Sequence, residues 1–325
     1  MNSLSFTNFK QIEKDFEILF DYPERVESFK KNLKNHFPKI HTNKNALDIN
    51  YNHRGLYEGN KRVTIDRMGS GFRRIFVILL YIFHPQYEII LINEPENYLH
   101  PAMIKKLLWA MENSSYAQIF FTTHSPLFIK PITLYQVIRV IKDKDNTLAL
   151  SLNNKKYDYT RLLRELNSDN LEMFFSDKVV LVEGMSDKIL LRGLIDKFYS
   201  GEKDIKVIAT QGKGNMKPYI DVLTMASIPY LIMLDKDIVK GNLLSDLLNY
   251  LKIYLSKTNI NKLIIKLKEY NIFILDNGDL ERNYPRKYQK KDRKSLNALE
   301  AANLITKKEF NSNKMKNLQE IINSL

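Results

Sequence analysis

Short, continuous apolar runs alternate with stretches of helical spacing along most of the chain. Such runs are typical of strands that are buried on both faces of a sheet. They occupy residues 88–92, 118–123, 179–182, 205–209, 230–234 and 272–275. Because apolar positions at helical spacing lie between these runs, as in 75–83, 189–198 and 243–268, we predict an α/β chain with a mainly parallel sheet and right-handed crossovers.

The remaining segments carry weaker patterns. Residues 1–60 are polar and rich in Lys and Asn, and they predict one amphipathic helix and one or two edge strands. Residues 137–152 predict a hairpin, and a polar helix is expected at 158–166. A chain of 325 residues can bury two cores. We therefore predict two domains, residues 1–168 and 169–325.

Two of the predicted strands end in carboxylates. Glu183 follows 179–182, with Asp187 four residues later, and Asp235 and Asp237 follow 230–234. Ligands bind at the carboxyl ends of parallel strands, so these acids are expected to share one crevice. Clustered acids need a cation, and oxygen ligands without nearby Cys or His favour Mg²⁺ or Mn²⁺. The alternative is that an apolar run followed by an acid is simply how many strands of α/β proteins end.

Composition narrows the class of protein. Lys and Arg outnumber Asp and Glu by 50 to 37, which gives a net charge of +13 and favours a polyanionic partner. The absence of cysteine excludes a disulfide scaffold and a thiolate zinc site. The longest apolar run, 75–83, is too short for a membrane span, and the N-terminus does not have the pattern of a signal peptide. We expect a cytoplasmic protein with no membrane association.

Three motifs in the first half resemble those of ABC-type ATPases. Gly69-Ser70-Gly71 precedes an apolar helix. Glu94 comes two residues after the predicted strand 88–92, and His124 directly follows the predicted strand 118–123. A helix N-terminus favours phosphate, although Ser70 could equally be an ordinary N-cap. The resemblance implies that Ser70 and Gly71 form the signature loop, that Glu94 polarises the attacking water, and that His124 senses the γ-phosphate.

The ATPase pattern is incomplete. No Gly-x-x-x-x-Gly-Lys-Ser/Thr occurs, and Asn93 stands where the family places an acid that helps to hold Mg²⁺. We therefore expect a partial ATPase lobe that does not hydrolyse ATP alone and binds ATP only with a partner that supplies a P-loop. Two explanations stay open: action with such a partner, which we favour, or a relic kept as a homodimer or docking surface.

The second half resembles the Toprim domain of overcoming-lysogenization-defect (OLD) family nucleases. The resemblance rests on Glu183-Gly184-x-x-Asp187, on Asp235-x-Asp237, and on Gly278-Asp279-Leu280-Glu281. It implies a Rossmann-like fold and a two-metal site. Glu183 and Asp187 would serve one ion, and Asp235, Asp237 and Glu281 would serve the other or bridge both. It also implies a downstream lysine that neutralises transition-state charge, and we choose Lys294 among Lys287, Lys290, Lys291, Lys294, Lys307 and Lys308.

Basic residues suggest how DNA is held. Residues 282–294 contain seven Lys or Arg among thirteen, with Tyr284 and Tyr288 between them, a composition that suits a DNA backbone. The glycine loop 211–215 could reach a phosphate through Lys213. The alternatives are a solvated loop and a simple tight turn. The predicted DNA contacts are Lys213, Arg282, Arg286, Lys287 and Lys290.

Together these observations predict a metal-dependent DNA endonuclease or nickase of the OLD type. The resemblance further implies a role in defence against foreign DNA. One alternative is a non-catalytic, nucleotide-gated regulatory or assembly subunit that works with a P-loop partner. Another is a different Toprim enzyme such as a topoisomerase, which needs a tyrosine nucleophile in a separate DNA-binding domain, and no region of this sequence resembles one.

Overall fold

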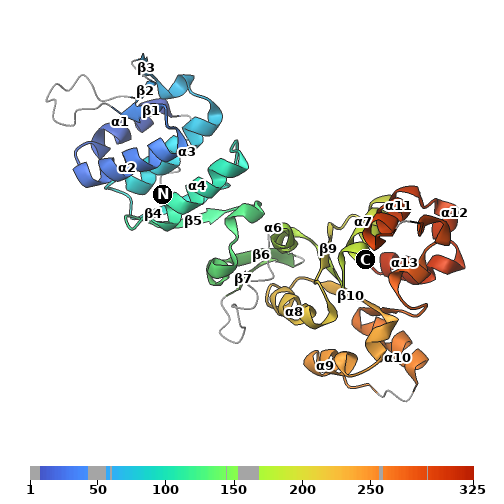
Figure 1. Cartoon of the computed structure of the whole chain (residues 1–325). Helices are drawn as coiled ribbons and strands as arrows, with labels where there is room; N and C mark the ends of the chain where they lie inside the picture. The colour runs from blue at the N-terminus through green and yellow to red at the C-terminus, as the bar shows by residue number, and fades with distance from the viewer. Residues whose placement is uncertain are drawn as a thin grey trace. The chain divides into compact units, whose positions relative to one another are not determined.

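The chain forms two compact units, Met1–Phe128 and Ile129–Leu325 (Figure 1). The structure is a computed structural model that describes residues 8–42, 56–58, 61–143, 145–152, 168–255, 259–290 and 292–325. The helix expected at 158–166 lies outside these residues. The domain boundary expected near 168 stays a prediction. In the packing of the chain, the segment from Ile129 to residue 152 belongs to the second unit.

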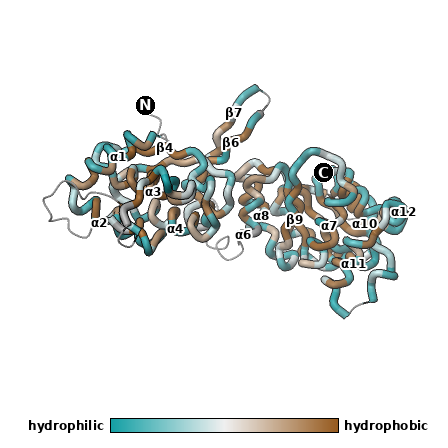
Figure 2. The backbone as a smooth tube through the Cα atoms, turned by 90° about the horizontal axis from the view of Figure 1, so that it is seen from above, coloured by the Kyte–Doolittle hydropathy of each residue, from teal (hydrophilic) through white to brown (hydrophobic). Residues whose placement is uncertain are grey.

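The first unit is built around one apolar helix. Its helices are α1 (Phe9–Leu19), α2 (Pro23–His36), α3 (Ser70–Phe83) and α4 (Pro101–Glu112). Its strands are β1 (Ile40–Thr42), β2 (Leu56–Glu58) and β3 (Lys61–Val63), which pair antiparallel, and β4 (Ile89–Asn93) and β5 (Gln118–Thr122), which pair parallel. Residues 75–83 of α3 are all buried, and hydrophobic residues (brown) are prominent in this helix (Figure 2). The core of the unit therefore forms against α3.

The N-terminal 60 residues contain more structure than their sequence predicts. Two helices are present where one is expected. Two short strands, β1 and β2, lie within these residues, and a third, β3, follows directly after them. Helix α2 carries eight charged or amide side chains among its 14 residues. Even so, Val26, Phe29 and Leu33 lie on one face and are buried. A narrow apolar stripe is enough for α2 to pack against α3, because residues 75–83 of α3 are apolar on all sides.

The second unit contains the predicted parallel sheet. Its strands are β8 (Lys178–Val182), β9 (Ile205–Ala209), β10 (Tyr230–Asp235) and β11 (Ile272–Leu275). They lie in the order β11-β10-β8-β9, and every pair is parallel. Successive residues of β8 enter different cores: Val179 and Leu181 pack in one cluster, and Val180 and Val182 in the other. Burial on both faces explains why the strand is a continuous apolar run.

Helices and a hairpin complete this unit. The helices beside the sheet are α7 (Met185–Phe198), α8 (Met216–Met225), α9 (Leu243–Tyr250), α10 (Ile260–Leu267), α11 (Lys294–Leu304) and α13 (Lys316–Asn323). The predicted hairpin is present as β6 (Ile138–Asp143) and β7 (Asn146–Ser151). The stretch 243–268, predicted as helical, forms two separate helices, because the chain turns at Lys252 with a φ of 56°.

Helices α7 and α11 approach each other unusually closely at Gly193. A Cβ atom built on Gly193 would lie 2.6 Å from the Cβ and 3.4 Å from the Cα of Ala302. Neither atom can rotate away, so only glycine fits without a shift of the helices. The contact matters for the site described below, because the first turns of these two helices carry Asp187 and Lys294.

We expect Gly193→Ala to destabilise the protein. In an unconstrained helix this change stabilises by about 1 kcal/mol, but the overpacking here costs about 1–3 kcal/mol. Urea unfolding should therefore show a net loss of about 1 kcal/mol in the free energy of unfolding. Gly214→Ala is the control, because a Cβ atom there has no atom within 4 Å. A Gly193→Ala protein more stable than wild type would contradict the packing.

Candidate metal centre

Three carboxylates meet at the carboxyl edge of the sheet. Leu181 of β8 pairs with Ile232 of β10, so these parallel strands end side by side. Glu183 follows β8, Asp235 ends β10, and Asp237 lies in the short helix after it. Each offers one oxygen, and these oxygens all lie within 4.8 Å of one another. Such a set of hard oxygen ligands could hold a divalent cation.

The acids are held in place and repel one another. The backbone N–H of Asp235 donates to Oε1 of Glu183 at 2.9 Å. Burial, followed by the charges of Asp187, Glu183 and Asp237, raises the pKa of Asp235 to about 7. Burial also raises the pKa of Glu183. Partly buried carboxylates that disfavour their own ionised forms fit a divalent cation, which would stabilise those forms.

Lys213 lies among these acids. Its Nζ pairs with Asp237 and lies 3.5 Å from Oε2 of Glu183. The loop after β9 places it there, because the N–H of Gly212 donates to the carbonyl of Glu183 at 2.9 Å. Sequence reasoning selected Lys213 as a contact to DNA phosphate and missed its position beside the carboxylates.

A second group of residues lies beside the first. Oδ2 of Asp187 accepts the N–H of Gly184 at 2.7 Å, so Asp187 caps the start of α7. Burial, with the charge of Glu281 as a further cause, raises the pKa of Asp187 to about 6. Nζ of Lys294 lies 3.2 Å from Oε1 of Glu281. The group of close oxygens thus contains Glu183 with Asp235 and Asp237 and not with Asp187, whereas the assignment of the acids to two ions stays a prediction.

The basic segment 282–290 is only partly free for a ligand. Arg282 pairs with Asp279 at 3.2 Å, and Lys287 pairs with Glu309. Arg286 and Lys290 are exposed, and neither has an ion pair among the residues that the structure describes. Lys291 lies outside those residues.

The two tyrosines of this segment are buried, whereas the sequence predicted that they would lie between the cations on a DNA-binding surface. Tyr284 and Tyr288 are buried in the core of the unit, so they do not interleave with the cations on a DNA-binding surface. The physical reason is that the segment winds through two short 3-10 turns, which place the aromatic rings inward and the long cations outward.

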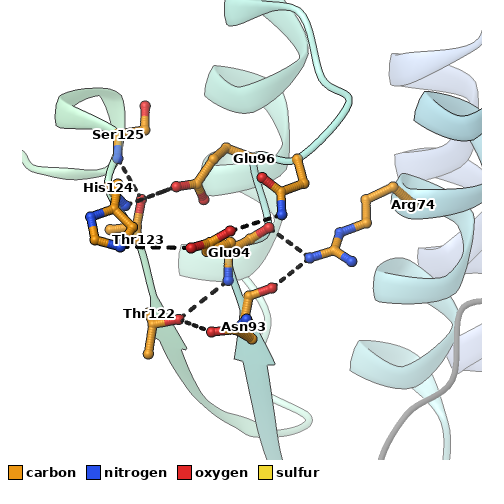
Figure 3. Close-up of polar contacts among 9 residues, drawn as sticks. Arg74, Asn93, Glu94, Glu96, Thr122, Thr123, His124 and Ser125 are labelled. Carbon is orange, nitrogen blue, oxygen red and sulfur yellow. Dashed lines mark hydrogen bonds and ion pairs between the residues drawn. The ribbon is translucent and has the colours of Figure 1, made fainter.

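In the first unit, Glu94 and His124 come together at the ends of β4 and β5 (Figure 3). Nε2 of His124 lies 3.6 Å from Oε1 of Glu94. Asn93 is exposed, and its Oδ1 accepts the hydroxyl of Thr122 at 2.6 Å. Oε1 of Glu96 accepts the backbone N–H of His124 at 2.9 Å. The two strand ends are thus tied together by side chains.

Arg74 is a residue that sequence reasoning missed. Its guanidinium donates to the carbonyls of Asn93 and Glu94 at 2.5 and 2.6 Å (Figure 3). Glu94 has a φ of 48°, which is uncommon for a residue with a side chain. Arg74 fixes this backbone turn. Its position one turn after Ser70, on the predicted signature helix, is the signal that could have found it.

At the predicted signature loop, the backbone of α3 lies very close to the backbone of Tyr98. Gly69 is the N-cap of α3 and Ser70 is its first residue, so the alternative in which Ser70 is the N-cap is wrong. A Cβ atom on Gly71 would lie 2.9 Å from the carbonyl oxygen of Tyr98. Glycine at 71 thus lets α3 begin against the loop that follows Glu94.

Two family descriptions match the chain in succession. Residues 4–130 match the AAA domain family AAA_21, whose description names the AbiEii toxin of a type IV TA system. Residues 174–237 match "Overcoming lysogenization defect protein-like, TOPRIM domain". The chain joins an AAA domain to an OLD-like Toprim domain. The three clustered acids all belong to this Toprim domain.

Three relatives are named as nucleases, and two of them carry the OLD name. The chain is 24% identical to the OLD nuclease of Thermus scotoductus over 213 residues, which are 60% of this chain and 39% of that protein. It is 28% identical to the Old nuclease of Escherichia phage P2 over 206 residues, 56% of this chain and 35% of that protein. It is also 28% identical to the endonuclease GajA of Bacillus cereus strain VD045 over 180 residues, 52% and 31% of the two chains. Each match therefore covers less than half of the relative.

Among the described residues, no helix has the length and apolar character that crossing a membrane requires.

The raised pKa of Asp235 predicts a pH dependence of stability. In the folded, metal-free protein the carboxyl binds its proton more tightly than in the unfolded chain. Its stabilising contribution is therefore complete below about pH 4 and is lost as pH rises to about 7. In EDTA, the free energy of unfolding should fall between pH 5 and pH 8. Asp235→Asn should reduce that fall by about 1–2 kcal/mol.

The control for this measurement is Asp196→Asn, an exposed acid on α7, which should leave the wild-type slope unchanged. Equal slopes for wild type and Asp235→Asn would show that Asp235 ionises as freely as it does in water.

Proposed function

We propose that this chain is a divalent-metal-dependent DNA endonuclease or nickase of the OLD type. The observation that carries the proposal is the convergence of Glu183, Asp235 and Asp237 at the carboxyl edge of the parallel sheet. The Toprim match and the nuclease names of the relatives support it.

The residues at the site would have distinct tasks. Glu183, Asp235 and Asp237 would hold one Mg²⁺ or Mn²⁺ ion, and Asp187 and Glu281 would contribute to a second. Bound ions of this kind supply an activated water and stabilise the charge on a phosphodiester and its leaving oxygen. Because Oε1 of Glu183 is engaged by the N–H of Asp235, its Oε2 is the oxygen that remains for a cation. Lys294, beside Glu281, would neutralise charge that develops on the phosphate.

DNA would be held outside this centre by exposed cations. Arg286 and Lys290 are the best placed, since they are exposed and have no acidic partner among the described residues. Arg282 and Lys287 would first exchange Asp279 and Glu309 for phosphates. Both cations are more than half exposed, and ion pairs of exposed side chains are weak, so this exchange costs little. Together with the net charge of +13, such contacts predict binding that weakens as salt increases.

The first unit would bind nucleotide only when a P-loop is supplied to it. The support is that Glu94 and His124 are in contact while the side chain of Asn93 is engaged with Thr122. In addition, β4 and β5 form a two-stranded parallel sheet that leaves Ile89, Leu91 and Phe120 about half exposed or more. Parallel sheets are normally covered on both faces. We therefore favour a P-loop protein as the partner, and we extend the proposal to defence against foreign DNA, as the OLD resemblance implies.

Cleavage of supercoiled plasmid tests the nuclease proposal. The purified chain should nick or linearise the plasmid with Mg²⁺ or Mn²⁺ and without ATP. Glu183→Gln and Asp235→Asn should each reduce the rate by about a hundredfold or more, because each removes a charged ligand. The amide oxygen that Glu183→Gln introduces can still accept the N–H of Asp235, so the loss would not reflect a broken hydrogen bond.

Asp196→Asn serves as the matched control and should cleave like wild type. Equal cleavage by wild type and both site variants would place the activity elsewhere. If wild type is inert with and without ATP but still forms a complex with a P-loop protein, the regulatory alternative would replace the nuclease proposal.

A further inference from the structure

The ammonium of Lys213 lies beside two of the acids of the candidate metal centre. Its side chain is only 16% exposed, and its ammonium pairs with Asp237 while lying 3.5 Å from Glu183. These are two of the three acids of the candidate metal centre. A single ammonium and a divalent ion cannot use the same carboxylate oxygens at once, because like charges at contact distance repel strongly in a partly buried site.

The backbone that leads to Lys213 is anchored, and the positions on either side of Lys213 are open. The N–H of Gly212 donates to the carbonyl of Glu183 at 2.9 Å, and the hydroxyl of Thr210 donates to the carbonyl of Val182 at 3.1 Å. Gly212 and Gly214 have no atoms within 4 Å of a Cβ position. The bonds that hold this loop to the end of β8 do not involve the Lys213 ammonium, so they do not depend on its pairing with the acids.

We propose that Lys213 is a resident counter-ion that holds Glu183 and Asp237 in the metal-free protein and is displaced by the divalent cation. This inference rests on the metal site of the proposed function. Without metal, the ammonium lowers the repulsion among the three acids. With metal, it is released toward solvent at the same edge of the sheet, where it can contact the phosphate of a bound DNA strand.

Metal affinity provides the first test. Mn²⁺ binding is followed by the loss of the free-ion electron paramagnetic resonance signal, at fixed pH and without DNA. Lys213→Met should bind Mn²⁺ about tenfold more tightly than wild type, because a competing charge is gone. Lys213→Arg should stay near wild type. Lys206→Met is the control: Lys206 forms a similarly buried pair with Glu172 on the same unit, away from the three acids, and its loss should leave the affinity unchanged.

The outcomes separate this inference from the proposed function. Equal or weaker Mn²⁺ binding by Lys213→Met, with binding lost in Asp235→Asn, would overturn the counter-ion role and keep the metal site. Absence of binding in wild type itself would overturn the metal site and the inference with it.

A second measurement needs no substitution at Lys213. Acetylation of the wild-type protein, read by mass spectrometry, should modify Lys213 several-fold faster in Mn²⁺ than in EDTA, because a released ammonium is accessible and no longer paired. Lys206 should react at the same rate in both. An unchanged rate at Lys213 while Mn²⁺ is bound would overturn the proposal.

Discussion

The parallel pairing of β8 beside β10 determines where the chemistry of this chain lies. Because the two strands run in the same direction, with Leu181 opposite Ile232, Glu183 and Asp235 are brought to one edge of the sheet. The outer strands extend the same edge: β9 leads to Lys213, and β11 leads to Glu281. The residues of the candidate site thus follow all four strands, as expected for the carboxyl edge of an open parallel sheet.

The burial that stabilises this sheet also raises the free-energy cost of ionising the carboxylates at its edge. All five residues of β8 are buried, and Glu183 and Asp235 at the carboxyl edge are partly buried, whereas Asp237 is exposed. Burial is the largest cause of the raised pKa at Glu183, Asp187 and Asp235. Lys213 relieves part of this cost and a divalent cation would relieve more. Positive charge nearby therefore favours the ionised forms of Glu183, Asp187 and Asp235.

Sequence patterns predicted the strands better than they predicted the contacts between them. Strands β9 and β11 have the predicted bounds, because buried parallel strands are unbroken apolar runs bounded by polar residues. The strand order could not be predicted in the same way, since all four runs look alike. The position of Lys213 depends on that order, because only a strand next to β8 brings its loop to Glu183. Arg74 was missed for a similar reason, since it acts on the backbone of a distant loop.

Where charged and apolar residues were interleaved, the sequence pattern did not reveal which side chains are buried. The seven cations of 282–294 obscured the fact that Tyr284 and Tyr288 are core residues. The polar residues of α2 likewise obscured its three buried apolar side chains. In both places a few apolar side chains determine the packing, while the numerous charged ones remain at the surface.

The most direct test of the account is a crystal structure of the Mn²⁺-soaked protein with diffraction data collected at the manganese edge. The account predicts an anomalous peak at ligand distance from Glu183, Asp235 and Asp237, with the Lys213 ammonium displaced from them. Full occupancy of Mn²⁺ at another site, with Lys213 still paired to Asp237, would contradict it.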